Sequence, residues 1–149
     1  MGRVTRAFLL LAGAGAIMTP QVGAQSWRGP RVVLSPAILA ALPKELAMIC
    51  QIRPKPHWTP TTSQLQAAEV ALAQVLPKWA STYGRQYLGL TIGGRKILQV
   101  RGFCRDYYQD DPKRSWERIP LHLLDAGTCA FTVNYDIGTH TLAELEWGT

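Results

Sequence analysis

Cysteine and histidine are the residue types in this sequence whose side chains could supply a nucleophile and a general base. The chain has three of each, and none of the cysteines stands beside a histidine. A catalytic thiolate needs an imidazole within hydrogen-bond reach and a lowered pKa. Cys129 lies in an alternating apolar pattern, where burial raises a thiol pKa, whereas Cys104 ends a predicted strand beside Arg105 but has no evident base. A small thiol-dependent hydrolase that uses Cys104 is therefore only an alternative function.

Acidic residues after Cys104 raise the question of a metal site. Asp106, Asp110 and Asp111 have two tyrosines and a glutamine between them. Their spacing does not follow a calcium-binding loop, and the lysine and arginine that come next would compete for the same carboxylates. The cysteines do not stand at zinc-ligand spacing either. We therefore expect no metal and no cofactor.

The same segment, residues 105–116, has the composition of a recognition loop. Tyrosine, tryptophan and arginine are enriched where proteins meet their partners, and loops carried by a rigid sheet commonly bind. In the alternative interpretation, the aromatic residues only close the edge of the sheet. The candidate binding residues are Arg105, Tyr107, Tyr108, Arg114 and Trp116.

The first 24 residues have the three parts of a secretory signal. Arg3 and Arg6 precede an apolar run over residues 7–18, and Val22-Gly23-Ala24 ends the segment with small residues. An apolar run of about a dozen residues is too short to span ~30 Å of hydrocarbon. We expect cleavage after Ala24, a periplasmic or secreted protein, and membrane contact only through the signal before cleavage.

Composition and charge narrow the class of partner. The 149 residues are 47% hydrophobic and 17% charged, which is typical of one globular domain. The formal net charge is +6, but the basic residues are scattered along the chain. This pattern disfavours nucleic acid and slightly favours anionic surfaces. We expect an envelope or extracellular protein, or an anionic polymer, as the partner.

Two regions with different patterns follow the signal. Residues 25–60 form a Pro-rich arm, in which Ser35-Pro36 and Pro43 predict the starts of two short helices. Residues 53–60 must be extended, because a residue before a proline is disfavoured in the helical region. Residues 61–149 are expected to form a single α+β domain.

The main helix of that domain is predicted to begin at a capping box, either Thr61 with Gln64 or Ser63 with Gln66. Its apolar residues recur at steps of three and four up to Tyr83, and Pro77 predicts a kink or a break.

Strand patterns follow Gly84, and Gly93-Gly94 suits a tight hairpin turn between the first two strands. Cys129, Phe131, Val133 and Tyr135 share one face of a later strand, and Ala143, Leu145 and Trp147 are the predicted inner residues of the last. The predicted strands cover residues 87–92, 95–103, 119–124, 128–136 and 141–147. The predicted fold is α+β, with N-terminal helices and one main amphipathic helix packed on a four- to five-stranded antiparallel sheet. This shape is cystatin-like by analogy of fold, and the analogy transfers no activity.

About a third of the chain, near its C-terminus, resembles a group of short exported bacterial proteins without an assigned activity. The resemblance rests on Phe103-Cys104, Trp116, residues 125–131, residues 133–136 and Trp147-Gly148. It implies a bacterial exported protein.

Three cysteines allow one internal disulfide in an oxidising compartment. The resemblance, and the apolar faces on which both residues lie, favour a bridge between Cys104 and Cys129. However, a strand over residues 119–124 in a plain meander would hold these two residues ~20 Å apart. A disulfide needs Cα atoms within about 7 Å. Either the bridge is absent or the sheet is no plain meander, and Cys50 paired with one of the two is the remaining option.

The sequence thus favours a non-enzymatic exported protein that binds a partner through residues 105–116. The alternatives are the thiol-dependent hydrolase and an inhibitor of a host or rival enzyme.

Overall fold

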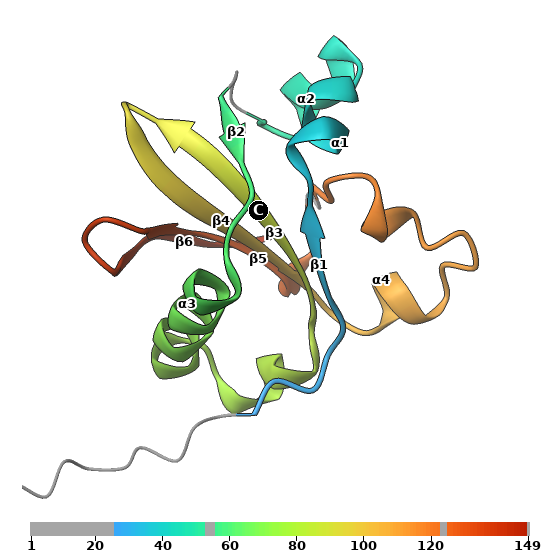
Figure 1. Cartoon of the computed structure of the whole chain (residues 1–149). Coiled ribbons are helices and arrows are strands. Elements are labelled where there is room, and N and C mark those ends of the chain that lie inside the picture. The colour runs from blue at the N-terminus through green and yellow to red at the C-terminus, as the bar shows by residue number, and fades with distance from the viewer. Residues whose placement is uncertain (1–25, 53–55, 123–124, 149) are drawn as a thin grey trace, which may run out of the picture.

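The computed structural model describes residues 26–52, 56–122 and 125–148 (Figure 1). The predicted signal segment, residues 1–24, lies outside these residues. The described chain is a mixed α+β structure built on one six-stranded sheet, which confirms the predicted fold class at this level.

The sheet differs from the predicted one in strand number and in direction. β1 (Arg31–Leu34) pairs in parallel with β3 (Gly84–Ile92), and β2 (His57–Trp58) pairs antiparallel with β3 further along the same edge. The prediction of four to five antiparallel strands is therefore wrong. β1 was not expected as a strand, because it is a short apolar run between two prolines within the arm. The other neighbours follow in antiparallel order as β4 (Arg95–Phe103), β5 (Gly127–Asp136) and β6 (Thr141–Gly148).

The β3–β4 hairpin is confirmed. Nine residues of β3 pair with nine of β4, from Gly84 opposite Phe103 to Ile92 opposite Arg95. Gly93 and Gly94 form the two-residue turn with φ of +56° and +76°, a conformation that costs an L-residue with a side chain about 1–2 kcal/mol.

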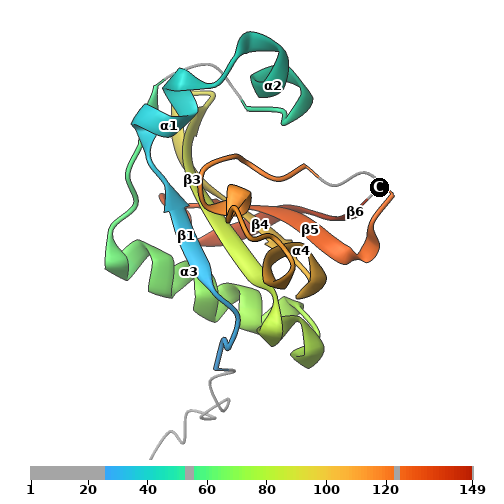
Figure 2. The same ribbon diagram turned by 90° about the vertical axis from the view of Figure 1, so that its right-hand side faces the viewer.

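The main helix, α3 (Thr62–Val75), begins at the predicted capping box of Thr61 with Gln64. It ends before Pro77, and the short helix η1 (Lys78–Thr82) follows the break. Figure 2 shows α3 running along one side of the sheet. The main hydrophobic cluster joins buried residues of α3 with buried residues of the strands, among them Leu65, Ala68, Leu72, Tyr87, Leu98, Val100, Phe131, Val133 and Tyr135.

Two short helices begin at the predicted prolines of the arm. Ser35 accepts a hydrogen bond from the Ile38 backbone N–H and caps α1 (Pro36–Ala41), and Pro43 precedes α2 (Lys44–Ile49). Leu39 of α1 packs with Leu88 and Leu90 of β3 in a second hydrophobic cluster. These two leucines alternate along β3 with Tyr87 of the main cluster, so α1 covers the face of the sheet opposite α3. We call this the outer face.

The predicted strand over residues 119–124 is wrong for residues 119–122, which form no strand, and residues 123 and 124 lie outside the described part. The chain after β4 instead forms α4 (Asp106–Gln109) and η2 (Ser115–Glu117) and then crosses the outer face. β4 and β5 are therefore direct neighbours, with Phe103 opposite Ala130.

This pairing brings the two strand-end cysteines together. Cys104 and Cys129 form a disulfide with Cα atoms 4.9 Å apart, as the resemblance implied. The geometric objection to the bridge disappears because no strand lies between β4 and β5.

The last strand keeps only part of its predicted pattern. Leu142 and Trp147 pack against the main cluster, whereas Ala143 and Leu145 are exposed. A register irregularity between positions 132 and 134 of β5 coincides with Glu144, whose φ is +56°. The extra residue of such a bulge shifts the alternation of side chains, which the sequence period could not show.

Candidate functional site

Polar side chains form a row across the outer face of the sheet. Gln86 of β3, Arg101 of β4, Thr132 of β5 and Glu146 of β6 are consecutive cross-strand partners. Gln86 and Arg101 are buried, with 0% and 3% of their surface exposed, although each lies on the face that a half-buried strand would turn to solvent. Such groups require partners when they are buried.

Arg101 finds its partners in backbone carbonyls and an amide rather than in a carboxylate. Its Nη1 donates to the Leu121 carbonyl at 2.9 Å, and its Nη2 donates to the Cys50 carbonyl at 2.5 Å. Its Nε and Nη2 both donate to the Gln99 side-chain oxygen. Burial lowers the pKa of Arg101 to about 10, so the guanidinium is still charged at neutral pH. Arg101 therefore fastens two segments to β4. One is the end of α2, and the other is residues 115–122, which we call the covering segment.

Gln86 fastens the covering segment from the other side. Its Nε2 donates to the carbonyls of Trp116 and Ile119, and its Oε1 accepts from the Leu121 backbone N–H at 2.7 Å. The amide thus uses both its donor and its acceptor group, as a buried amide must. The covering segment pairs with no strand: Gln86 and Arg101 bind its backbone at Trp116, Ile119 and Leu121, and the turn at η2 forms backbone hydrogen bonds of its own.

A groove lies beside this network, between α2 and the outer face of β4, β5 and β6. Its volume is about 540 Å³. The apolar residues that line it are Ala47 and Met48 of α2, Ile52 and Ile92. The polar ones are Gln51, Gln99, Thr132, Asn134, Glu144 and Glu146. A smaller recess of about 50 Å³ shares Gln51, Gln99, Thr132 and Glu146 with the groove and is also lined by Arg101, His122 and Trp147.

The floor and the rim of the groove differ in charge. Gln99 donates to the Asn134 side-chain oxygen at 3.2 Å, and the Asn134 amide nitrogen donates in turn to Glu144. Glu146 is exposed, and its carboxylate has no hydrogen-bond or ion-pair partner among the described residues. The groove therefore offers an apolar wall, an amide and hydroxyl floor, and a carboxylate rim on β6.

The cysteines do not form a catalytic set in the described structure. Cys104 is bridged, and a disulfide sulfur is not a thiolate, so the bridged form has no nucleophile at that position. Cys50 is free but buried, and its thiol donates to the Pro120 carbonyl. Burial raises the pKa of Cys50, and the nearby charge of Arg101 opposes that shift only in part. A buried thiol with a raised pKa is a poor nucleophile.

The histidines lie on three different elements. His57 is in β2, His140 is in the turn after β5, and His122 follows η2 and lines the small recess. Burial, followed by the charge of Arg101, lowers the pKa of His122, which favours its neutral form. Among the described residues, no three His, Cys, Asp or Glu side chains are grouped as metal ligands.

The five predicted residues of the 105–116 loop separate into buried and exposed ones. Trp116 is only 4% exposed and packs on Phe103 and Tyr108, with ring centroids 5.7 and 6.2 Å away. Tyr108 is half-buried and donates its hydroxyl to the Thr82 carbonyl. The exposed members are Arg105, Tyr107 and Arg114, and Arg114 forms an ion pair with Glu117.

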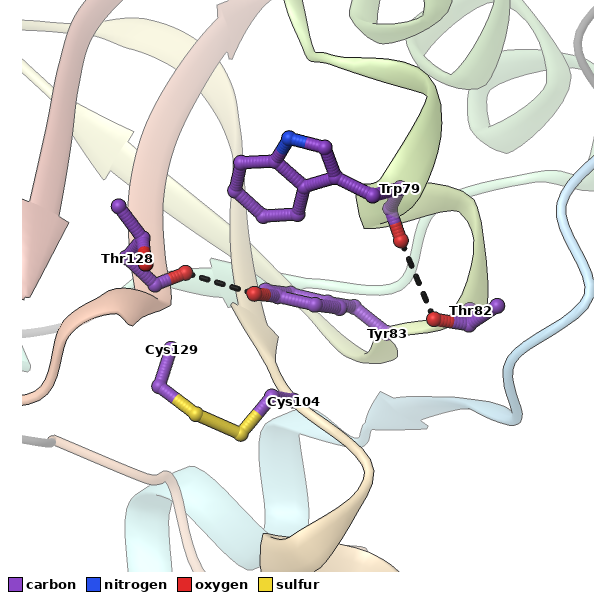
Figure 3. Close-up of a disulfide and its surroundings, with 6 residues drawn as sticks. All are labelled: Trp79, Thr82, Tyr83, Cys104, Thr128 and Cys129. Atoms are coloured by element: carbon purple, nitrogen blue, oxygen red, sulfur yellow. Dashed lines mark hydrogen bonds between the residues drawn. A yellow bond between two sulfur atoms is a disulfide. The ribbon is translucent and has the colours of Figure 1, made fainter.

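The disulfide supports a further layer of aromatic residues. Figure 3 shows Tyr83 between the disulfide and Trp79, with its hydroxyl directed at the Thr128 carbonyl, to which it donates at 2.7 Å. Trp79 also contacts Trp147, with ring centroids 5.5 Å apart. The bridge and these rings hold the neighbouring ends of β4, β5 and β6 together.

Sequence reasoning missed the groove residues for a physical reason. The groove residues Gln99, Thr132 and Asn134 stand on the polar side of two correctly predicted strands, as does Arg101 in the adjoining recess. A polar side in an alternating strand normally indicates solvent. The sequence did contain one signal of a site, because Gln86, Gln99 and Arg101 lie on that side of the β3–β4 hairpin. It was not sufficient, since the burial of these residues depends on the segment that covers them.

The described residues include no helix that is both long and apolar enough to cross a bilayer. Comparisons with protein-family models, with curated proteins and with solved structures find no match to this chain.

Proposed function

We propose that this protein is an exported, non-enzymatic binding protein and that it holds a macromolecular partner in the groove between α2 and β4 to β6. The partner is an envelope or extracellular protein or polymer, and the carboxylate rim of Glu144 and Glu146 disfavours the anionic polymer that the overall charge led us to expect. The observation that carries the proposal is the groove itself, which combines an apolar wall, exposed at Met48, with polar groups on a floor that is held by hydrogen bonds. Binding sites commonly combine apolar contact area with a few positioned polar groups.

The rigidity of the floor supports this assignment. Gln99 and Arg101 are buried and hydrogen-bonded, so the strands below the groove present their polar groups without a prior rearrangement. Preorganisation of this kind reduces the conformational entropy that is lost on binding. Met48, by contrast, is 71% exposed on the wall, and its flexible side chain can adapt to an apolar partner surface.

Three further observations support export. The first 24 residues have the pattern of a secretory signal. The Cys104–Cys129 disulfide is the kind of bridge that persists outside the cytoplasm. The resemblance of the C-terminal third to short exported bacterial proteins points in the same direction. The cystatin-like shape remains a fold analogy, and inhibition of an enzyme would be one form of the proposed binding.

Site-specific photocrosslinking in cells that produce the full chain tests the proposal. A photoreactive amino acid replaces Met48 on the groove wall, and the matched control replaces Val70, which is 60% exposed on α3. A third position, Tyr107, samples the 105–116 loop. Mass spectrometry identifies each adduct and the compartment in which it forms.

We expect one specific extracytoplasmic adduct from position 48 and none from position 70. An adduct from position 107 alone would move the binding surface to the loop and contradict the groove. Equal labelling from positions 48 and 70, or no adduct at all, would contradict the binding function.

A further inference from the structure

One edge of the sheet is a strand whose outward backbone has no strand partner in the described part of the chain. β6 pairs only with β5, and the opposite edge of β6 ends the sheet. Residues 143–146 of β6 are all exposed. An open strand edge presents N–H and C=O groups that can pair with another extended chain.

Two carboxylates determine which chain this edge can accept. Glu146 lies on the outer face opposite Thr132, and Glu144 lies at the bulge, where it accepts a hydrogen bond from Asn134. Both glutamates line the groove. A strand added to the edge of β6 would bring its alternate side chains beside these glutamates, at the distance at which cross-strand charge pairs interact.

We propose that the partner is a polypeptide, and that an extended segment of it carrying lysine or arginine at alternate positions pairs with the edge of β6. This inference rests on the proposed function and specifies the partner. The basic side chains extend over the outer face and reach Glu144 and Glu146. Their aliphatic stems then face the apolar wall at Met48 and Ile52.

Charge also disfavours the pairing of this edge with a second copy of the chain in the register that is centred on Leu145. An antiparallel pairing of two β6 strands centred on Leu145 would place Glu144 opposite Glu146 of the other copy, on both sides of the centre. Like charges directly opposite each other in a sheet are destabilising. The chain as a whole has 16 basic and 10 acidic residues, so an acidic edge on it is a local feature rather than a reflection of the average composition.

A random heptapeptide library displayed on phage tests this proposal with the purified full chain. Selection on the wild type should enrich Lys or Arg at alternate positions. Selection on Glu144→Gln/Glu146→Gln should lose that enrichment, and selection on Glu144→Lys/Glu146→Lys should favour Asp or Glu instead. An enriched peptide, made synthetically, should bind the double Gln variant about tenfold more weakly, and its binding to the wild type should weaken with added salt.

Backbone pairing is tested with N-methylated forms of the same peptide. Methylation of the alternate amides that face β6 should abolish binding, whereas methylation of the other alternate amides should leave it unchanged. Equal effects of the two forms would overturn edge pairing, and basic enrichment that survives in the double Gln variant would overturn the role of the glutamates.

The two proposals can fail separately. In one outcome, the enriched peptides carry no alternate basic residues, and they no longer bind when Thr132→Arg fills the groove. This outcome would overturn the present inference but would leave the groove function standing. A Met48 crosslink to a polymer that contains no polypeptide would do the same. Failure to enrich any peptide, together with a Met48 crosslink to a protein, would overturn the edge-strand mode of binding.

Discussion

Replacement of Arg101 by methionine should destabilise the fold far more than loss of an exposed arginine. Arg101 is 3% exposed and supplies the donors for the carbonyls of Cys50 and Leu121. Each buried carbonyl left without a donor costs about 1–3 kcal/mol. The guanidinium no longer has to be desolvated, which offsets part of that loss. We expect Arg101→Met to lower the free energy of unfolding by about 3 kcal/mol.

The assay is urea unfolding of the oxidised protein, followed by tryptophan fluorescence. With a slope of about 1.5 kcal/mol per M, the expected loss lowers the urea midpoint by about 2 M. The matched control is Arg114→Met, because Arg114 forms an ion pair with Glu117 but has 68% of its side chain exposed. Exposed pairs contribute about 0–1 kcal/mol, so the control should remain close to the wild type.

Hydrogen exchange locates the effect within the molecule. In the Arg101→Met variant, the Leu121 amide should exchange faster, because the covering segment loses one of its two anchors while Gln86 is still in place. If the two methionine variants have equal stability, or if Leu121 exchanges as slowly as in the wild type, Arg101 does not fasten the covering segment and the reasoning is refuted.

Two further predictions concern the disulfide and a histidine. Cys104→Ser/Cys129→Ser should lower the free energy of unfolding by about 3.5 kcal/mol, since the bridge closes a loop of 25 residues. The control Cys50→Ser should lower it by less than half of that, and equal urea midpoints for the two variants would contradict this prediction. The lowered pKa of His122 means that the unfolded chain binds the proton more readily. Stability should therefore be constant above the unfolded pKa of about 6.5 and fall as the pH drops below it. Thermal unfolding at several pH values should show a weaker decline for His122→Asn, and an unchanged decline would contradict the assignment.

Local chemistry in the sequence was sufficient for several individual elements, but not for β1, for β2 or for residues 119–122. The capping box at Thr61, the prolines at 36 and 43, and Gly93-Gly94 act within a few residues of themselves, so their effects can be read without knowledge of the rest of the chain. The apolar alternation of residues 128–136 is equally local, because it reflects the pleat of a single strand.

The structure decided what required contacts between distant residues. Arg101 and Gln86 are buried because the covering segment lies over them, and their side chains bind its backbone. The sequence of the strands does not predict where the covering segment lies, and the sequence of the covering segment does not predict which strand residues it covers. The same contacts keep residues 119–122 out of the sheet, which makes β4 and β5 neighbours and joins Cys104 to Cys129. The groove and its acidic edge arise in turn where α2 lies across from β6. The sequence by itself thus determined the helices with local caps, the β3–β4 hairpin and the strand pattern of β5, through interactions within a turn or a strand. The tertiary structure decided the site, because hydrogen bonds between distant segments determine which polar residues are buried and which remain open.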